Sequence, residues 1–243
     1  MNFDQQHVLV TGGGSGIGLA IAQAMVAAGA RVTITGRNRQ KLESLANDQP
    51  AIGVRVCDVT DDAAVIALRD ELVADGGIDI LVNNAGVMDF FNVLDGHPLE
   101  KQIQEIDIDA VGPVRMIHHF LPSMLLRDAT IINVSSGLAY LPYSKAPIYS
   151  AAKGFVHFYT LCLREQLRGT SVRVVELLPP IVDTAMAAGV KFPIPPMPPA
   201  KLVAALMQGL RRGKTEIAPG TSVLLKWMGR LLPQFGLRQM TKS

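Results

Sequence analysis

The segment Gly12–Gly18 is the feature that most constrains the fold of this chain. It reads Gly-Gly-Gly-Ser-Gly-Ile-Gly and joins an apolar run, residues 7–11, to a helical pattern over residues 19–28. The apolar run predicts a buried parallel strand. A glycine-rich turn between a strand and a helix lets the backbone approach a pyrophosphate, which the helix N-terminus attracts. The alternative is a tight turn that binds nothing, but so many glycines at a helix start are costly without a reason.

Apolar runs alternate with helical patterns along the rest of the chain. The expected strands are residues 7–11, 31–35, 52–56, 78–82, 130–134, 172–178 and a short one at 215–218. The expected helices are residues 19–28, 40–46, 61–74, 99–126, 148–168 and 200–212. This alternation predicts an α/β fold with a doubly wound, mostly seven-stranded parallel sheet and helices on both faces. We expect one domain over residues 1–243, with a core at 1–184, a substrate lid region at 185–213, and the last strand and tail at 214–243.

Composition and charge exclude several classes of protein. With 49% hydrophobic and 18% charged residues in 243, the chain is typical of a packed globular protein. Its net charge of +2 is too small to indicate nucleic-acid binding. It has neither an apolar run long enough for a membrane span nor an N-terminal signal pattern, so we expect a cytoplasmic protein. Cys57 and Cys162 both follow apolar neighbours and are expected to be buried, reduced thiols.

The residues after the second expected strand bear on the choice of nucleotide. They read Thr35-Gly36-Arg37-Asn38-Arg39, with no acid. Dinucleotide-binding folds usually place an acid here to bond the ribose 2′-hydroxyl, whereas an arginine suits a 2′-phosphate. The segment therefore favours NADP(H) over NAD(H). The alternative is that Arg37 and Arg39 are ordinary surface residues at the start of the next helix.

Further polar and small residues follow the other strands. Asp58 follows the third strand, where it can contact an adenine edge or cap the next helix. Asn83-Asn84-Ala85-Gly86 follows the fourth strand, Ser136 the fifth and Pro179 the sixth. In an open parallel sheet the ligand site lies outside the carboxyl ends of the strands. All these residues are therefore expected at one edge of the sheet.

Tyr149 and Lys153 are the strongest candidates for chemistry. Four residues apart on an expected helix, they share one face. A phenol has a pKa of about 10, and a fixed cation beside it favours the phenolate and lowers that pKa. Ser136 could hold the oxygen that gains or loses the proton. The alternative is an ordinary half-buried aromatic residue and a solvated lysine.

The long helix expected over residues 99–126 contains Gly112-Pro113. Pro113 cannot donate to the carbonyl of Asp109, so that carbonyl is left free and the helix should kink. The free carbonyl could hold a water. His118 and His119 lack the spacing of a helical metal pair, so we expect core or interface side chains and no metal site.

Two segments near the C-terminus have no assigned chemistry. Residues 192–199 form an apolar, proline-rich loop, expected to be a lid over the site or a polyproline ligand. The tail beyond Glu216 has no acid and carries apolar residues at helical spacing around Trp227. Its cations are Lys226, Arg230, Arg238 and Lys242. It could dock on protein, cover the substrate pocket or make weak contact with an anionic membrane surface.

Taken together, the motifs resemble the short-chain dehydrogenase/reductase family. The resemblance covers residues 8–184. It rests on Thr11-Gly12-x-x-x-Gly16-x-Gly18, Asn83-Asn84-Ala85-Gly86, Ser136, Tyr149-x-x-x-Lys153 and residues 179–184, in the family's order and spacing. The runs at 131–139, 179–184 and 213–217 are similar to a bacterial subgroup named after the D-alanine–teichoic-acid operon oxidoreductase.

The resemblance implies a Rossmann fold and a role for each motif residue. Tyr149 would be the general acid/base, Lys153 would lower its pKa and bond the nicotinamide ribose, and Ser136 would polarise the substrate. The residues implied to contact the dinucleotide are Gly12, Ser15, Gly16, Ile17, Gly18, Asp58, Val59, Asn83, Ala85, Gly86, Tyr149, Lys153, Pro179, Val182 and Thr184. Arg37 is expected to join them by binding the 2′-phosphate. A homodimer or homotetramer is also implied.

Two positions depart from the family pattern. Asp109 stands where the family has a catalytic asparagine, which acts mostly through its backbone carbonyl. Because Pro113 frees that carbonyl whatever the side chain, we expect the proton relay to survive, although the charge of Asp109 could shift the pH optimum. Pro180 stands where glycine is more common, and it should stiffen the loop beside the nicotinamide.

The sequence thus predicts an NADP(H)-dependent oxidoreductase that transfers a hydride between nicotinamide and a carbonyl or secondary alcohol. Its small-molecule substrate should be apolar, in a pocket formed by Met88, Phe90, Leu138, Tyr140, Tyr143, Met186 and the proline-rich loop. The alternative is an NADP-sensing regulatory protein without turnover. The presence of Ser136, Tyr149 and Lys153 together argues against it, because a sensor does not need an activated phenol.

Overall fold

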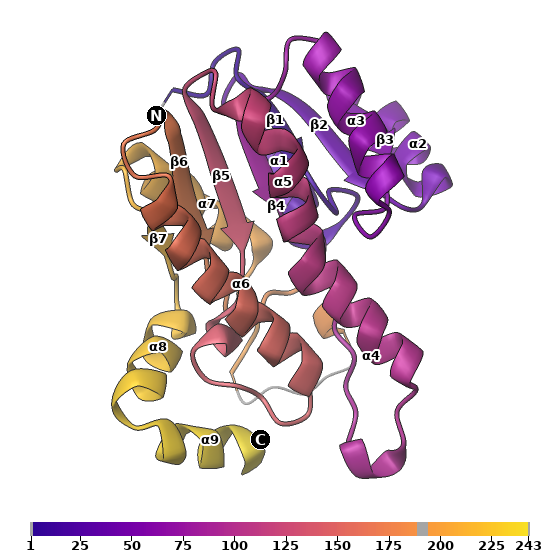
Figure 1. Ribbon diagram of the computed structural model, residues 1–243. Helices are drawn as coiled ribbons and strands as arrows, with labels where there is room; N and C mark the ends of the chain where they lie inside the picture. Colours follow the sequence, from indigo (N-terminus) through magenta and orange to yellow (C-terminus); the bar gives the residue numbers. More distant parts are fainter. Residues whose placement is uncertain (1, 189–193, 243) are drawn as a thin grey trace.

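The computed structural model describes residues 2–188 and 194–242 (Figure 1). Its strands form one seven-stranded sheet, every pair parallel, in the order β3-β2-β1-β4-β5-β6-β7. They are β1 (His7–Val10), β2 (Arg31–Gly36), β3 (Ile52–Val56), β4 (Ile80–Asn83), β5 (Ala129–Val134), β6 (Val172–Leu177) and β7 (Glu216–Ile217). The predicted doubly wound sheet is confirmed, with strand ends shifted by one or two residues.

Helices cover both faces of the sheet, and each face has its own core. The helices are α1 (Gly16–Ala27), α2 (Arg39–Asp48), α3 (Asp62–Ala74), α4 (Leu99–Ile106), α5 (Gly112–Met124), α6 (Pro147–Gln166), α7 (Pro199–Arg211), α8 (Thr221–Leu231) and α9 (Pro233–Lys242). One core contains Met25, Leu42 and Leu206, from α1, α2 and α7. The other contains Leu68, Phe120 and Leu163, from α3, α5 and α6. Strands buried between two helical layers must be apolar throughout, which explains their continuous hydrophobic runs.

The prediction of a single kinked helix over residues 99–126 needs a correction, because the structure divides this segment into two α-helices. A π-helical turn, Asp107–Val111, separates α4 from α5, and the N–H of Gly112 donates to the carbonyl of Asp107 across it. Pro113 then lies in the first turn of α5, where a helix needs no N–H donor. The wider turn therefore accommodates the proline without breaking the helix, and it is here that Asp109 becomes buried.

The C-terminal part adds β7 to the sheet edge and then α8 and α9, which project below the sheet in Figure 1. Cys57 is buried as expected, but Cys162 is exposed, because it lies on the outer side of α6. Among the described residues, no helix has the length and apolar character needed to cross a membrane.

Candidate active site

A cavity of about 720 Å³ lies at the carboxyl ends of the strands. It runs from the glycine-rich turn and Arg37 to Tyr149 and Lys153. Of the predicted site residues, Gly12, Ser15, Gly16, Ile17, Arg37, Asp58, Val59, Ala85, Gly86, Ser136, Tyr149, Lys153, Pro179, Val182 and Thr184 line it. Gly18, Asn83 and Asp109 are not among the lining residues. One cavity therefore brings together residues from six strand ends.

The glycine-rich turn forms the cradle at one end. Gly12 has a φ of 63°, and a Cβ there would lie 2.8 Å from the Cα of Ala85, so only glycine fits. Gly18 lies behind the turn, where a Cβ would be 2.5 Å from the carbonyl oxygen of Gly12. Ser15 precedes α1 without a side-chain capping bond among the described residues, and the first turn has no acid. The first N–H groups of α1 thus suit an anionic group, and this end fits a dinucleotide pyrophosphate.

The structure separates the two candidate arginines. Arg37 lines the cavity, with its Nη1 3.9 Å from Oδ2 of Asp58. Arg39 instead begins α2 and pairs along the helix with Glu43 at 3.6 Å, both side chains exposed. The alternative reading as a surface residue is therefore correct for Arg39. Arg37 is also exposed but lines the cavity, and its role in cofactor choice stays a prediction.

Asp58 does not cap the following helix, α3, because Asp61 occupies the N-cap position. Asp61 caps α3, accepting from the N–H of Ala64 at 3.2 Å. Asp58 Oδ1 accepts from the N–H and hydroxyl of Thr60, at 2.9 and 2.8 Å. Its other oxygen is the one facing Arg37, so Asp58 helps to hold the arginine at the cavity wall.

Asn83, which was predicted to contact the dinucleotide, does not line the cavity, whereas its neighbour Asn84 does. Asn83 is buried in the core, where its Nδ2 donates to Oδ1 of Asn133 at 2.9 Å. Asn84 lines the cavity, and its Nδ2 donates to the carbonyls of Thr11 and Gly12, at 2.9 and 3.2 Å. It therefore braces the glycine-rich turn. Asn83 is the last residue of β4, whereas Asn84 belongs to the segment that follows the strand and runs along the cavity.

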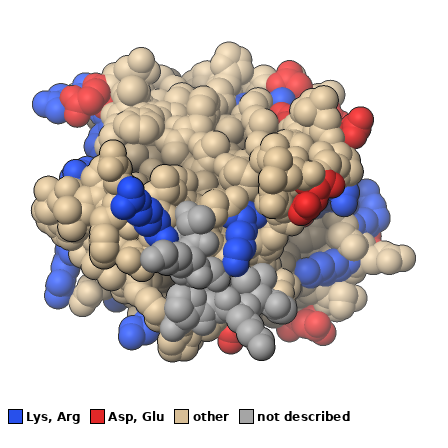
Figure 2. All heavy atoms as spheres, turned by 90° about the horizontal axis from the view of Figure 1, so that it is seen from below, with Lys and Arg blue, Asp and Glu red and all other residues tan. Residues whose placement is uncertain are grey.

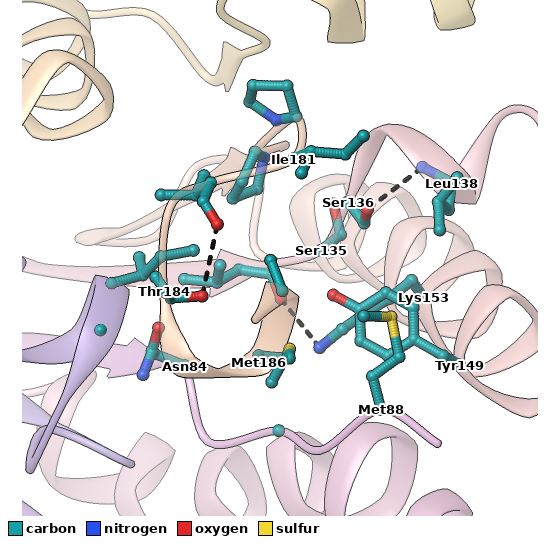
Figure 3. Close-up of a pocket in the computed structure, with 18 of the residues that line it drawn as sticks. Asn84, Met88, Ser135, Ser136, Leu138, Tyr149, Lys153, Ile181, Thr184 and Met186 are labelled. Atoms are coloured by element: carbon teal, nitrogen blue, oxygen red, sulfur yellow. Dashed lines mark hydrogen bonds between the residues drawn. The ribbon is translucent and has the colours of Figure 1, made fainter. Parts of the chain in front are cut away.

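Tyr149 and Lys153 lie together at the other end, as Figure 3 shows. The Nζ of Lys153 is 5.3 Å from the centre of the Tyr149 ring and donates to the carbonyl of Val134 at 3.4 Å. Ser136 lies beside them at the end of β5, its Oγ accepting from the N–H of Leu138 at 3.2 Å. The neighbouring Ser135 turns away and donates to Oε1 of Glu176. Ser136 rather than Ser135 therefore faces Tyr149, and its role in the reaction stays a prediction.

The pKa of Tyr149 is raised, whereas the sequence predicted that Lys153 would lower it. Burial raises it, and the Lys153 charge and the Ser136 hydroxyl oppose that rise without overcoming it. The lysine acts in the predicted sense. Its effect is reduced because a carboxylate shares its charge.

That carboxylate is Asp109, which is 0% exposed. Its Oδ1 lies 3.2 Å from Nζ of Lys153, and its Oδ2 accepts from the N–H of Val87 at 3.1 Å. Burial raises the pKa of Asp109 while Lys153 opposes the rise. Burial would lower the pKa of Lys153, but Asp109 and Tyr149 together raise it. The side chain of Asp109 thus contacts the lysine directly; a water on its carbonyl stays a prediction.

Glu105, four residues before Asp109, is a buried residue of this site that was not predicted from the sequence. It is 1% exposed, and its Oε1 accepts from the N–H of Asp89 at 3.3 Å. Burial raises the pKa of Glu105 to about 7, against the opposing effect of that N–H. The signal was its four-residue spacing from Asp109, which puts both on one helix face. That spacing alone does not indicate a buried site, because glutamates on helices are mostly exposed.

The substrate end of the cavity is largely as expected. Five of the six predicted pocket residues line it, namely Met88, Phe90, Leu138, Tyr143 and Met186. Tyr140 does not: its hydroxyl donates to Oε2 of Glu216 at 3.1 Å, and its ring packs against His157. The prediction for Tyr140 is wrong because packing with the C-terminal part draws the ring away from the cavity.

The proline-rich loop and the tail complete the wall. Residues 194–198 line the cavity, and Met197 forms a parallel bridge with Val182. Phe192 and Pro193 lie outside the described residues. Leu224, Leu225 and Met240 of α8 and α9 also line the cavity, so the tail does cover the pocket. Figure 2, the view from below, shows a face made mostly of uncharged residues.

Comparison with known proteins agrees with this geometry. Residues 6–192 match the short chain dehydrogenase family. An uncharacterized oxidoreductase of Bacillus subtilis, DltE, is 35% identical over 189 residues, which is 76% of this chain and 75% of that protein. A Burkholderia cenocepacia short chain dehydrogenase in complex with NADP superposes with a TM-score of 0.88, at 26% identity and 99% coverage of both chains.

A Brucella melitensis 3-ketoacyl-(acyl-carrier-protein) reductase complexed with NADH superposes with a TM-score of 0.79, at 26% identity, over 85% of this chain and 91% of that one. The fold, the cavity at the strand ends and the family match all agree. This chain belongs to the short-chain dehydrogenase/reductase family and is an NAD(P)-dependent oxidoreductase.

Proposed function

We propose that this protein is an NADP(H)-dependent oxidoreductase that interconverts a carbonyl compound and a secondary alcohol, with Tyr149 as general acid/base. The observation that carries the proposal is the arrangement of Ser136, Tyr149 and Lys153 at one end of a cavity whose other end is the glycine-rich turn. That spacing suits a molecule with a pyrophosphate at one end and a reactive ring at the other.

The division of labour follows from position. A bound nicotinamide would supply or accept the hydride. Tyr149 donates or takes the proton of the substrate oxygen, and Ser136 holds that oxygen through its hydroxyl. Lys153 stabilises the phenolate and lies where it can also reach a ribose. Apolar residues around the reacting end favour a hydrophobic carbonyl compound as substrate. Separately, we infer that the protein is cytoplasmic.

We also infer a homodimer or homotetramer. Exposed apolar side chains on α4 and α6, two helices of one side of the sheet, support the inference; they include Leu99, Ile103, Phe155 and Phe158. Such clusters on a folded surface usually mark association sites.

The proposal is tested by following NADPH and NADH oxidation with a panel of carbonyl compounds, from small polar acids to bulky apolar ketones. We expect turnover with apolar compounds, and loss of it in the Tyr149→Phe variant. Tight binding of NADPH without turnover of any compound would instead favour a sensor.

Cofactor choice should depend on Arg37. Replacing it with Ala removes the cation at the expected place of the 2′-phosphate, and a hydrogen bond to a charged group contributes about 1.5–3 kcal/mol. We expect the Kd for NADPH to rise about 10- to 150-fold while the Kd for NADH changes little. Titration of dinucleotide binding by fluorescence measures both. Arg39→Ala is the matched control and should leave both constants unchanged; equal weakening of NADH and NADPH by Arg37→Ala would contradict the role.

Gly86 should be essential for the Asp109–Lys153 pair. A Cβ at Gly86 would lie 2.4 Å from Oδ1 of Asp109 and 3.4 Å from Nζ of Lys153. The Gly86→Ala variant must displace the buried ion pair, and misplacing a catalytic group by about 1 Å can cost on the order of 10²-fold in rate. Steady-state kcat/KM measures the loss. Gly154→Ala, beside Lys153 on α6 with nothing within 4 Å of its Cβ, should keep full activity; a similar loss there would refute the explanation.

A further inference from the structure

Two buried carboxyl groups share one buried cation behind Tyr149. Asp109 and Glu105 are 0% and 1% exposed, and Lys153 is 4% exposed. A single lysine balances a single carboxylate, and an uncompensated second charge in such a place is very costly. Asp109 is the carboxylate in contact with Lys153. Glu105 is therefore the group that holds a proton as the pH rises toward neutral, in line with its raised pKa of about 7.

The outer oxygens of the two groups fit the exchange of a proton. Oε2 of Glu105 is buried and accepts no hydrogen bond from the described residues. Oδ1 of Asp109 lies 3.2 Å from Nζ of Lys153, so it is the oxygen through which Asp109 contacts the lysine. The other oxygen of each group is held by a backbone N–H, that of Asp89 for Glu105 and that of Val87 for Asp109. The backbone thus fixes one oxygen of each group, while the other oxygen of Glu105 is left for a proton and that of Asp109 faces the lysine.

The chain of groups ends near solvent. Glu105 lies behind the loop that carries Asp89, whose side chain is 46% exposed and lies 3.5 Å from Nε2 of His97. Toward the interior, the order is Glu105, Asp109, Lys153 and Tyr149. Glu105 and Asp109 are four residues apart where α4 leads into the π-helical turn. Asp109 contacts Lys153 at 3.2 Å, and Nζ of Lys153 lies 5.3 Å from the centre of the Tyr149 ring.

We propose that Glu105 is a proton-relay residue: it passes protons between solvent and Tyr149 through the carboxylate of Asp109 and the amine of Lys153. This inference rests on the proposed function, because it concerns the proton that accompanies the transferred hydride. It assigns to side chains of this protein a task that the sequence assigned to a water on the Asp109 carbonyl.

The proton balance in the reducing direction is closed. The O–H bond of Tyr149 breaks and its proton goes to the substrate oxygen. The phenolate takes a proton from the ammonium of Lys153, and the resulting amine takes one through Asp109 from the carboxyl group of Glu105. Glu105, now a carboxylate, is reprotonated by solvent. Oxidation of the alcohol runs the same transfers in reverse.

The groups facing Glu105 set its pH dependence. They are Asp89 in the adjacent loop, Asp109 in the π-helical turn, and Tyr149 and Lys153 on α6. Since the ordinary pKa of 4.5 is raised to about 7 by folding, the native state holds a proton that the unfolded chain releases. The resulting stabilisation is complete below the ordinary value and is lost as the pH rises through about 7.

The test compares Glu105→Gln with Glu100→Gln, an exposed position on the same helix. The amide of Gln can still accept from Asp89 but cannot pass on a proton. We expect Glu105→Gln to lower kcat in the reducing direction about tenfold or more, with KM changed less than about twofold. The wild-type decline of kcat as pH rises through about 7 should be absent. Glu100→Gln should behave as wild type.

A second measurement needs no turnover. Infrared difference spectra of the protein alone, titrated through neutral pH, should show a protonated-carboxyl band that disappears near pH 7 and is missing from Glu105→Gln. Denaturant unfolding should show the matching loss of stability with rising pH in wild type only. The relay is overturned if Glu105→Gln keeps the wild-type pH profile of kcat, or if the band remains. Absence of any Tyr149-dependent turnover in wild type would instead refute the proposed function.

Discussion

Replacing Tyr149 with Phe lowers kcat/KM for carbonyl reduction by about 10²–10⁴-fold, the contribution of a positioned general acid. The substitution removes one hydroxyl and keeps the ring that lies against Lys153. Folding and dinucleotide binding should therefore change little, so the loss should appear in kcat. Stopped-flow measurement of NADPH oxidation at saturating substrate measures it.

Tyr159→Phe is the matched control for this prediction. Tyr159 lies on the same helix α6, but its ring stacks on Phe155 and it does not line the cavity. The control should keep wild-type kcat. If Tyr149→Phe retained more than about a tenth of the wild-type kcat, general acid catalysis by Tyr149 would be excluded.

The sheet and most of the cavity could be predicted because their determinants are local. An apolar run bounded by glycine or a polar residue predicts where each strand ends, and parallel strands then collect these ends at one edge. Gly12, Arg37 and Ser136 line the cavity for this reason, and Tyr149 lines it from α6. To place Ser136 and Tyr149 at the cavity, it was enough to predict where one strand ends and which face of one helix is turned inward.

The missed features depend on contacts between distant segments. Tyr140 lies outside the pocket because its hydroxyl donates a hydrogen bond to Glu216 of β7, which is distant in the sequence. Asn84 rather than Asn83 lines the cavity, because the side chain of Asn83 donates to Asn133 in the core. Glu105 is buried because the π-helical turn and α6 cover its side chain, and the sequence does not show this packing. Local propensity does not specify which helix face is covered, so a buried glutamate cannot be distinguished from a solvated one.

The largest effect on stability is expected from Lys153→Met. The change removes the cation that contacts Asp109 and leaves a carboxylate with no exposed surface unpaired. Breaking a buried ion pair on one side typically costs about 3–5 kcal/mol, a large part of the total stability of a domain. Guanidinium unfolding at neutral pH measures the loss, with Lys41→Met, at an exposed position of α2, as the control.

The origin of that loss can be separated from a simple packing defect by its pH dependence. Without Lys153, the pKa of Asp109, which burial already raises, rises further, because the opposing charge is gone. The stability of Lys153→Met should therefore recover as the pH falls and the buried carboxyl group takes up a proton. The double variant Lys153→Met/Asp109→Leu should regain part of the loss at neutral pH, since no charge is left buried. A loss that is the same at all pH values, or a double variant less stable than Lys153→Met alone, would show that Asp109 does not hold its charge through Lys153. In that case Asp109 could not pass a proton from Glu105 to the lysine, and the relay would fail with it.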